Sequence, residues 1–216
     1  MTLRKVSESI RKAELGSHRE LGSVTLIAVS KVQSVEKIKQ VLGAGHRDFG
    51  ENRVQEAQLK WPELRSEYES INLHLLGPLQ TNKADQAVRI FDVIHSVDRE
   101  RLAAKLSSSI SKTGKDIEMF VQVNFDDEFQ KAGISVNDVD GFVKACTEKY
   151  KLKVSGLMCI PPVNKSAEKF FLELKNVAER NGLFKLSMGM SADYEKAIFC
   201  GSTHVRVGTA IFGSRQ

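Results

Sequence analysis

Cysteine is scarce in this sequence, and its scarcity excludes two kinds of protein. The 216 residues contain three cysteines, Cys146, Cys159 and Cys200, and no CxxC pair. An odd number of widely spaced cysteines argues against a disulfide framework and against a zinc site, and it suits reduced thiols. The five histidines form no HxH or HExxH pattern, so we expect no metal cofactor.

Long apolar runs and blocks of one charge are also missing. The apolar run at 73–76 is too short to cross a bilayer, and residues 1–15 carry charges throughout, unlike a signal peptide. We therefore expect a cytoplasmic protein that binds no membrane. The net charge is +5, but Lys and Arg alternate with Glu and Asp along the chain. This pattern predicts no nucleic-acid binding, although a small anionic ligand would suit the excess charge.

The sequence does contain a regular alternation of two kinds of segment. Short β-branched or apolar segments are each followed by a longer segment with helical periodicity. No linker or composition shift interrupts them, so we expect a single domain over residues 1–216. The predicted strands cover residues 26–29, 47–50, 73–76, 92–97, 117–123, 154–160, 185–190 and 204–208.

The segments around these strands predict helices. A lead-in helix over residues 3–20 precedes the first strand, because one helical stripe contains Leu3, Val6, Ile10, Ala13 and Leu21. Ser34 and Asp98 are candidate N-caps of later helices. Strand and helix alternating eight times is typical of a (β/α)8 TIM barrel, and a doubly wound open sheet is the alternative. The predicted later helices include residues 34–45, 53–61, 99–110, 136–150 and 167–180.

In such a barrel the active site forms at the carboxyl ends of the strands, and Lys31 follows the first predicted strand directly. A lysine held near an apolar wall has a lowered pKa and can attack carbonyl groups. The alternative is a lysine that only opens the loop before the next helix, with its charged end in solvent.

Two loops near the C-terminus have the residue types of a phosphate site. Ser191 and Thr209 follow the seventh and eighth predicted strands, and Gly189, Gly208 and Gly213 would let backbone N–H groups approach an anion. The helix that follows Ser191 would contribute its dipole. The alternative is that Ser191 only caps that helix and that the glycines only form turns.

Arg206 lies within the last predicted strand, between Val205 and Val207. If the two valines face the helices, Arg206 points into the barrel, where a guanidinium requires a carboxylate or a ligand as partner. A structural ion pair is the alternative to a ligand. His74, His95 and His204 also lie in strand segments, where we expect satisfied interior histidines without a catalytic role. Met158 and Cys159 close the sixth predicted strand and are expected to line the core or a cavity.

Several stretches closely resemble the YggS/PROSC-like pyridoxal phosphate homeostasis proteins, which share the barrel of the alanine racemase N-terminal domain. The likeness runs from about residue 24 to 215, and SMGMS and RxGTAIFG are its most specific strings. The stretches are IAVSKVQSVEKI, FGENRVQEA, LHLLGPLQTNKAD, IHSVD, GLMCIPP, LSMGMSADYEKAI and VRVGTAIFGSR. The chain departs from the usual pattern at Gln130, Ala132 and Cys159.

The resemblance implies a fold-type III site for pyridoxal 5′-phosphate (PLP), with a role for each matching position. Lys31 would be the Schiff-base lysine, and Arg206 would neighbour the pyridine nitrogen. Asn52 would make a polar contact near the ring. The implied phosphate ligands are Ser191, Gly208 and Thr209.

The same resemblance implies a PLP carrier or buffer that takes part in PLP homeostasis. Related racemases and decarboxylases need a second, β-rich domain, which we do not expect here. Tyr68, Tyr150 and Tyr194 lie in helical segments, so none is an obvious second base. An arginine beside the pyridine nitrogen would also weaken the ring as an electron sink.

We therefore expect no clear catalytic turnover, and we expect a monomer or weak dimer with apo PLP-dependent enzymes as partners. The alternatives are a weak amino-acid racemase, an aldolase that uses Lys31 without a cofactor, and a regulatory module that docks on PLP enzymes.

Overall fold

Eight parallel strands close into a barrel in the computed structural model, which describes residues 2–125, 132–162 and 165–213. Around the barrel β1 pairs with β2, β3 follows, and β4 pairs with β5; β7, β8 and β9 then lead back to β1. This closed ring confirms the TIM-barrel prediction, because an open sheet would leave two unpaired edges. The barrel strands are β1 (Thr25–Val29), β2 (Asp48–Glu51), β3 (Asn72–Leu75), β4 (Val93–Val97), β5 (Glu118–Asn124), β7 (Val154–Cys159), β8 (Lys185–Met190) and β9 (His204–Val207).

One further strand, β6 (Ile134–Ser135), pairs with the end of β5 outside the ring of eight. Val123 lies opposite Ile134 and Asn124 lies opposite Ser135. Two residues are too few to show the period of two that marks a strand in sequence, so no local pattern predicts this element.

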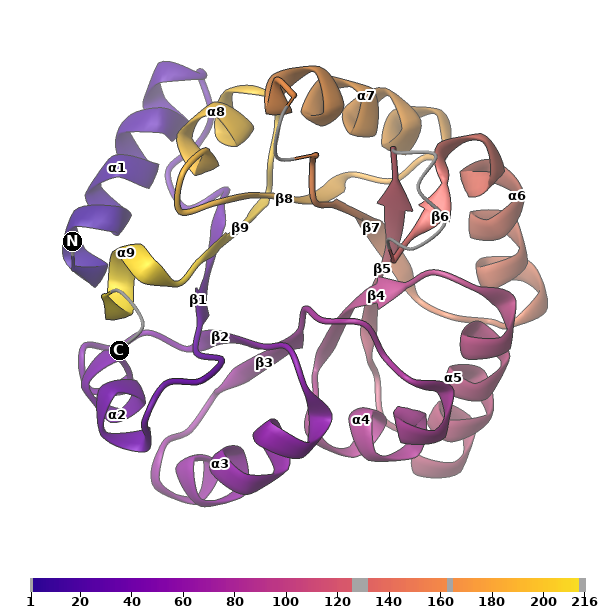
Figure 1. Ribbon diagram of the computed structural model, residues 1–216, viewed down its shortest axis with the longest axis horizontal. Helices are drawn as coiled ribbons and strands as arrows, with labels where there is room; N and C mark the ends of the chain where they lie inside the picture. Colours follow the sequence, from indigo (N-terminus) through magenta and orange to yellow (C-terminus); the bar gives the residue numbers. More distant parts are fainter. Residues whose placement is uncertain (1, 126–131, 163–164, 214–216) are drawn as a thin grey trace.

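The helices surround the barrel in a ring (Figure 1). The lead-in helix α1 lies outside this ring against α8 and α9, and it ends at Gly16, four residues earlier than predicted. The α-helices are α1 (Leu3–Gly16), α2 (Val35–Gly43), α3 (Val54–Glu67), α4 (Ala84–Ile90), α5 (Glu100–Thr113), α6 (Val139–Lys144), α7 (Ala167–Arg180), α8 (Tyr194–Phe199) and α9 (Thr209–Phe212). Shorter helical turns are η1 (Thr81–Lys83), η2 (Val136–Asp138) and η3 (Ala145–Lys149).

Of the two predicted N-caps, one is confirmed and one is wrong. The Ser34 hydroxyl accepts the backbone N–H of Lys37 at 3.5 Å and so caps α2. Helix α5 begins one residue later than expected, with Arg99 as its N-cap, and no side chain caps it. The Asp98 carboxylate instead accepts a hydrogen bond from the Arg99 guanidinium.

Helix α3 continues past the point where the sequence predicted its end. It includes Pro62 and runs to Glu67, although a proline inside a helix removes one backbone hydrogen bond. Trp61 and Leu64, on either side of the proline, are both fully buried in the main core. Burial of these two side chains outweighs the local preference to stop, because each contributes about 2–3 kcal/mol of hydrophobic stabilisation.

Two hydrophobic clusters hold the layers together. The larger lies between the barrel strands and the helices around them, and the smaller lies under α1. In the smaller cluster, Val6, Ile10 and Ala13 pack with Ile198 of α8 and Val205 of β9, which confirms this part of the predicted stripe. The prediction is wrong for Leu21, which lies beyond the end of α1 and is exposed. In the described part of the chain, no helix is long and apolar enough to cross a bilayer.

Candidate functional site

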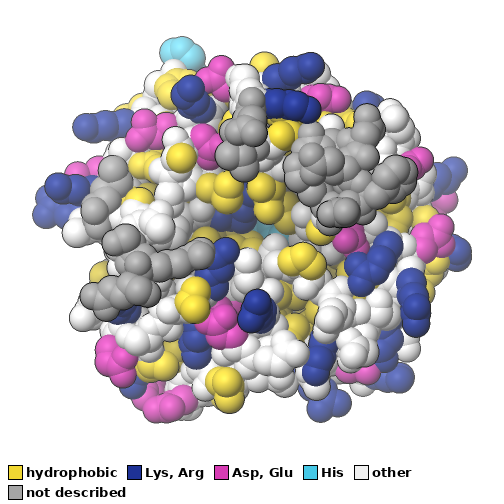
Figure 2. Space-filling view, in the orientation of Figure 1, with side chains coloured by type: hydrophobic (Ala, Val, Ile, Leu, Met, Phe, Trp, Pro, Cys, Tyr) yellow, Lys and Arg dark blue, Asp and Glu magenta, His cyan; other side chains and the backbone are white. Residues whose placement is uncertain are grey.

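A cavity of about 310 Å³ opens at the carboxyl ends of the strands, and all six predicted site residues line it. They come from three places around the barrel: the end of β1, the end of β2, and the neighbouring ends of β8 and β9. Hydrophobic side chains gather around the centre of this face (Figure 2). The residues brought together are Lys31, Asn52, Ser191, Arg206, Gly208 and Thr209.

Ser191 connects the two predicted phosphate loops. Its hydroxyl oxygen accepts the backbone N–H of Gly208 at 3.3 Å, so the loops after β8 and β9 lie side by side. The alternative that Ser191 only caps the next helix is wrong. The N-cap of α8 is Asp193, whose carboxylate accepts the backbone N–H of Met190 at 2.7 Å.

The three glycines of these loops have different roles. Gly208 lines the cavity and precedes α9, whose first N–H groups have no acceptor within the helix and can bind an anion. Gly189 has a φ of +90°, and a Cβ there would lie 2.5 Å from the Cβ of Ala197, so it permits close packing against α8. Gly213 ends α9. Of the three, only Gly208 is among the described residues that line the cavity.

Arg206 points into the barrel, as predicted, and it is 5% exposed. Its guanidinium donates to the hydroxyl of Ser187 at 2.8 Å and to the carbonyl oxygen of Cys159 at 2.9 Å. Both acceptors are neutral, so within the described residues the structure does not show the alternative of a structural ion pair. Burial lowers the pKa of Arg206. A buried guanidinium at a cavity wall fits a ligand that brings an acceptor or a negative charge.

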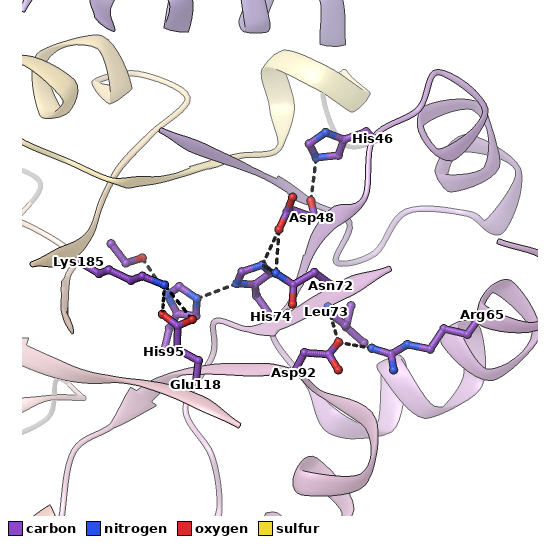
Figure 3. Close-up of polar contacts among 11 residues, drawn as sticks. His46, Asp48, Arg65, Asn72, Leu73, His74, Asp92, His95, Glu118 and Lys185 are labelled. Carbon is purple, nitrogen blue, oxygen red and sulfur yellow. Dashed lines mark hydrogen bonds and ion pairs between the residues drawn. The ribbon is translucent and has the colours of Figure 1, made fainter. Parts of the chain in front are cut away.

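Below Arg206, a line of hydrogen bonds crosses the barrel toward its amino end (Figure 3). The Ser187 hydroxyl lies 2.9 Å from Nδ1 of His95, and Nε2 of His95 lies 2.9 Å from Nδ1 of His74. Nε2 of His74 lies 3.3 Å from the carboxylate of Asp48. Asp48 also accepts from the side chain of Asn72 at 2.9 Å.

Both ring nitrogens of His74 and of His95 have hydrogen-bonding partners. Nε2 of His74 also lies 3.1 Å from the side-chain nitrogen of Asn72. At the other end of the line, the Ser187 hydroxyl accepts from Arg206. His204, beside them, contacts Thr203 through Nδ1 at 2.8 Å. The three strand histidines are therefore satisfied interior residues, as the sequence predicted.

Burial holds His95 and His204 neutral. It lowers the pKa of His95 well below its usual value and that of His204 to about 3, and the neighbouring histidine charge acts in the same direction. Lys185 and Glu118 form an ion pair at the same end of the barrel, with 2.7 Å between the Lys185 ammonium nitrogen and a Glu118 carboxylate oxygen (Figure 3). Among the residues that the structure describes, no group of histidine, cysteine, aspartate or glutamate is arranged to hold a metal ion.

Asn52 also borders two neighbouring cavities, which contain less of the predicted chemistry. One, of about 550 Å³, is lined by Lys83 and Arg53 among others, and one, of about 280 Å³, is lined by Gln122 and Ala132. The larger cavity has more space, but the 310 Å³ cavity combines an amine, a guanidinium and two hydroxyls. We therefore take the cavity of Lys31 as the functional site.

Two of the three residues where the sequence departs from the family pattern lie beside this site. Cys159 contributes its carbonyl oxygen to Arg206, while burial raises the pKa of its thiol to about 12 and makes the sulfur unreactive. Ala132 lies at the neighbouring cavity, and Gln130 is outside the described residues.

Sequence reasoning missed Ser187, which anchors Arg206, and it missed a charged cluster of Glu51, Glu56 and Lys60 beside Lys31. A glutamate at the end of a buried strand was a usable signal for Glu51. The partners of Ser187 are His95, 92 positions away along the chain, and Arg206, 19 positions away. No local sequence pattern therefore marks Ser187.

Comparisons with known proteins agree with this geometry. A family model described as "Alanine racemase, N-terminal domain" matches residues 13–216. The pyridoxal phosphate homeostasis protein of Pseudomonas aeruginosa is 38% identical over 217 residues, which cover 98% of this chain and 94% of that protein. The corresponding protein of Escherichia coli K12 is 36% identical over 223 residues, with 99% and 95% covered. The structure of PipY from Synechococcus elongatus with PLP bound superposes with a TM-score of 0.81 at 36% identity, covering 95% of this chain and 99% of that one.

Proposed function

The chain belongs to the pyridoxal phosphate homeostasis protein family, and from that premise we propose that it binds PLP in the cytoplasm as a carrier or buffer of the cofactor. The observation that carries the proposal is the cavity of about 310 Å³, because it gathers every residue type that PLP binding requires. An amine faces the same space as phosphate-type donors and a buried guanidinium.

Each lining residue has a part that follows from its chemistry. When bound, PLP supplies an electrophilic aldehyde, a phosphate and an electron-withdrawing ring. Lys31 would hold the aldehyde carbon covalently through its amine, with release of water. The Ser191 and Thr209 hydroxyls would bind the phosphate, together with the N–H of Gly208, which would exchange its hydrogen bond to Ser191 for one to the phosphate. Arg206 would donate to the ring nitrogen, while Asn52 would make a polar contact beside the ring.

The same lining supports binding with little catalysis on amino acids. Racemisation needs a base on each face of the substrate carbon, and among the described lining residues the ionisable side chains are Lys31 and Arg206. A guanidinium already carries its proton and has no acceptor, so it cannot serve as the second base. An Arg206 that donates to the ring nitrogen also keeps that nitrogen unprotonated, which weakens the ring as an electron sink.

The proposal extends to partners. A carrier has to deliver its cofactor, so we propose apo PLP-dependent enzymes as recipients and a monomer or weak dimer as the working state. The mouth of the cavity lies at the carboxyl ends of the strands, and its rim includes the exposed side chains of Ile160 and Met190.

Borohydride reduction of the PLP-loaded protein, followed by peptide mapping, tests the proposal. We expect a yellow protein whose reduced pyridoxyl group is on Lys31. A pyridoxyl group found only on Lys83, in the neighbouring cavity, would contradict the assignment of the site.

A further inference from the structure

Lys31 occupies a tight turn with an unusual backbone. The backbone N–H of Gln33 donates to the carbonyl oxygen of Ser30 at 3.1 Å, which closes a four-residue turn with Lys31 and Val32 in its centre. Val32 has a φ of +59°, a left-handed conformation that turns normally assign to glycine or asparagine. A β-branched side chain is strained there, so other contacts must maintain the turn.

Those contacts come from helix α3. A carboxylate oxygen of Glu56 accepts the backbone N–H of Val32 at 2.6 Å. The ammonium group of Lys60 lies 2.6 Å from the same oxygen and 3.1 Å from a carboxylate oxygen of Glu51. It also donates to the carbonyl oxygen of Ser30 at 3.0 Å, so its three N–H groups serve three acceptors. The residues before and after Lys31 are thus both bonded to this cluster.

Glu51 connects the cluster to the barrel. Its side chain is fully buried at the end of β2, and one oxygen accepts from the Ser30 hydroxyl at 2.8 Å and from the indole of Trp61 at 3.2 Å. Burial raises the pKa of Glu51, although Lys60 opposes that effect. Burial also works against ionisation of Glu56, but the hydrogen bonds from Lys60 and Val32 outweigh it and lower its pKa.

We propose that Glu51, Glu56 and Lys60 are positioning residues that hold the strained turn and so aim the Lys31 amine into the cavity. This inference rests on the proposed function, which gives Lys31 its covalent role. None of the three side chains is among the described residues that line the cavity, so they act on PLP only through the turn.

The proposal predicts that the covalent step and the non-covalent binding step respond differently to a change at Glu56. Loss of Glu56 frees the N–H of Val32 and removes one acceptor of Lys60, so the turn relaxes and Lys31 spends less time in a reactive position. Among the described residues, no hydrogen bond or ion pair joins the cluster to the phosphate loops after β8 and β9, so we expect these loops to keep their geometry.

Two probes separate these steps in the Glu56→Ala variant. With PLP as the probe, the change in its visible absorption gives the rate of adduct formation. Pyridoxine 5′-phosphate, which carries an alcohol in place of the aldehyde, reports binding without a covalent bond. We expect adduct formation to be about tenfold slower, with the Kd for pyridoxine 5′-phosphate unchanged. Glu56→Gln, which keeps an acceptor for Val32, should restore part of the rate.

Glu67→Ala is the matched control, because Glu67 lies on the same helix and pairs with Lys39, away from the turn. It should leave both measurements at the wild-type level. Retained binding of pyridoxine 5′-phosphate also shows that each variant is folded.

The strained backbone of Val32 allows a second, independent test of the proposal. Val32→Gly removes the conformational strain, so the turn needs less support from Glu56. In that background Glu56→Ala should slow adduct formation by a much smaller factor than it does with Val32 present. An equal factor in both backgrounds would contradict the role of the strained turn.

The outcomes of this experiment are distinct. A Glu56→Ala variant that reacts at the wild-type rate, or that loses affinity for both probes equally, would overturn the positioning role but not the assignment of the PLP site in the wild type. Wild-type protein that forms no adduct on Lys31 would instead remove the proposed function, and the inference with it.

Discussion

The two ends of the barrel satisfy their polar side chains in different ways. At the amino end, Asp48, His74 and His95 bond to one another, and Lys185 pairs with Glu118. At the carboxyl end, Lys31, Ser191 and Arg206 border a cavity. One end is a polar core that is complete without a ligand, and the other presents donors to a ligand.

This difference separates the residues that stabilise the fold from those that bind. Partners in the amino half lie on different strands, so their hydrogen bonds hold the barrel closed. Ser187 and Arg206 lie where the two halves meet, because Ser187 bonds to His95 below and to Arg206 above. Substitutions at the amino end should therefore mainly lower the free energy of unfolding, and substitutions at the carboxyl end should mainly weaken PLP binding.

The largest expected effect is at the carboxyl end, in Lys31→Ala. The amine that forms the covalent bond is lost, so we expect no borohydride-fixed adduct at all. Because Lys31 is half-buried at the cavity rim, the unfolding free energy without PLP should change by less than about 0.5 kcal/mol.

Urea unfolding and mass spectrometry of the reduced protein measure the two quantities in Lys31→Ala. Lys83→Ala, in the neighbouring cavity, is the control and should keep the adduct. If the Lys31→Ala variant unfolds, Lys31 is required for stability as well as for binding, which would contradict the distinction between the two ends.

The next effect is at the amino end and depends on pH. Burial keeps His95 and His204 neutral in the folded protein, whereas both take up a proton near pH 6.5 when unfolded. The unfolded state therefore binds more protons below pH 6.5, and stability falls as the pH falls toward 3. Between pH 7 and pH 5 each histidine should cost about 2 kcal/mol of unfolding free energy.

Urea unfolding at both pH values measures this dependence. His204→Phe should reduce it by the contribution of one histidine, while Lys31→Ala should leave it unchanged. An unaltered dependence in His204→Phe would show that His204 is not the neutral buried group described here.

A smaller effect is expected at the phosphate loops. Ser191→Ala or Thr209→Ala removes one hydrogen bond to a charged group, which should weaken PLP retention by about 1–3 kcal/mol. Dialysis of each variant beside the wild type would show faster loss of the cofactor. Equal binding of pyridoxal and PLP by the wild type would rule out the phosphate role of these loops.

The fold followed from the sequence because its strongest signals are local. Each of the eight barrel strands is an apolar segment flanked by helical periodicity, and the predicted bounds agree with the structure to within one residue. The misses have tertiary causes. Helix α3 passes Pro62 because Trp61 and Leu64 are buried on the core, and β6 exists only through its pairing with β5.

The site followed from the sequence only in part. Residue types at strand ends, with the family resemblance, identified six of the residues that line one cavity. The partners of those residues could not be predicted. Arg206 donates to a hydroxyl and a carbonyl rather than to a carboxylate, and the backbone N–H of Val32, in the turn of Lys31, donates to Glu56 of α3. Such contacts are set by the closing of the barrel, which no local pattern records.

The central claim is that this protein holds PLP and passes it on without transforming amino acids, and one preparation of PLP-loaded protein tests it most directly. One portion is mixed with an apo PLP enzyme and the recovery of that enzyme's activity is followed. Another is incubated with alanine, lysine, ornithine or diaminopimelate while substrate chirality and decarboxylation are followed. We expect recovery of the apo-enzyme and no turnover above trace level. Robust turnover that disappears in Lys31→Ala would contradict the claim, as would a failure to restore the apo-enzyme.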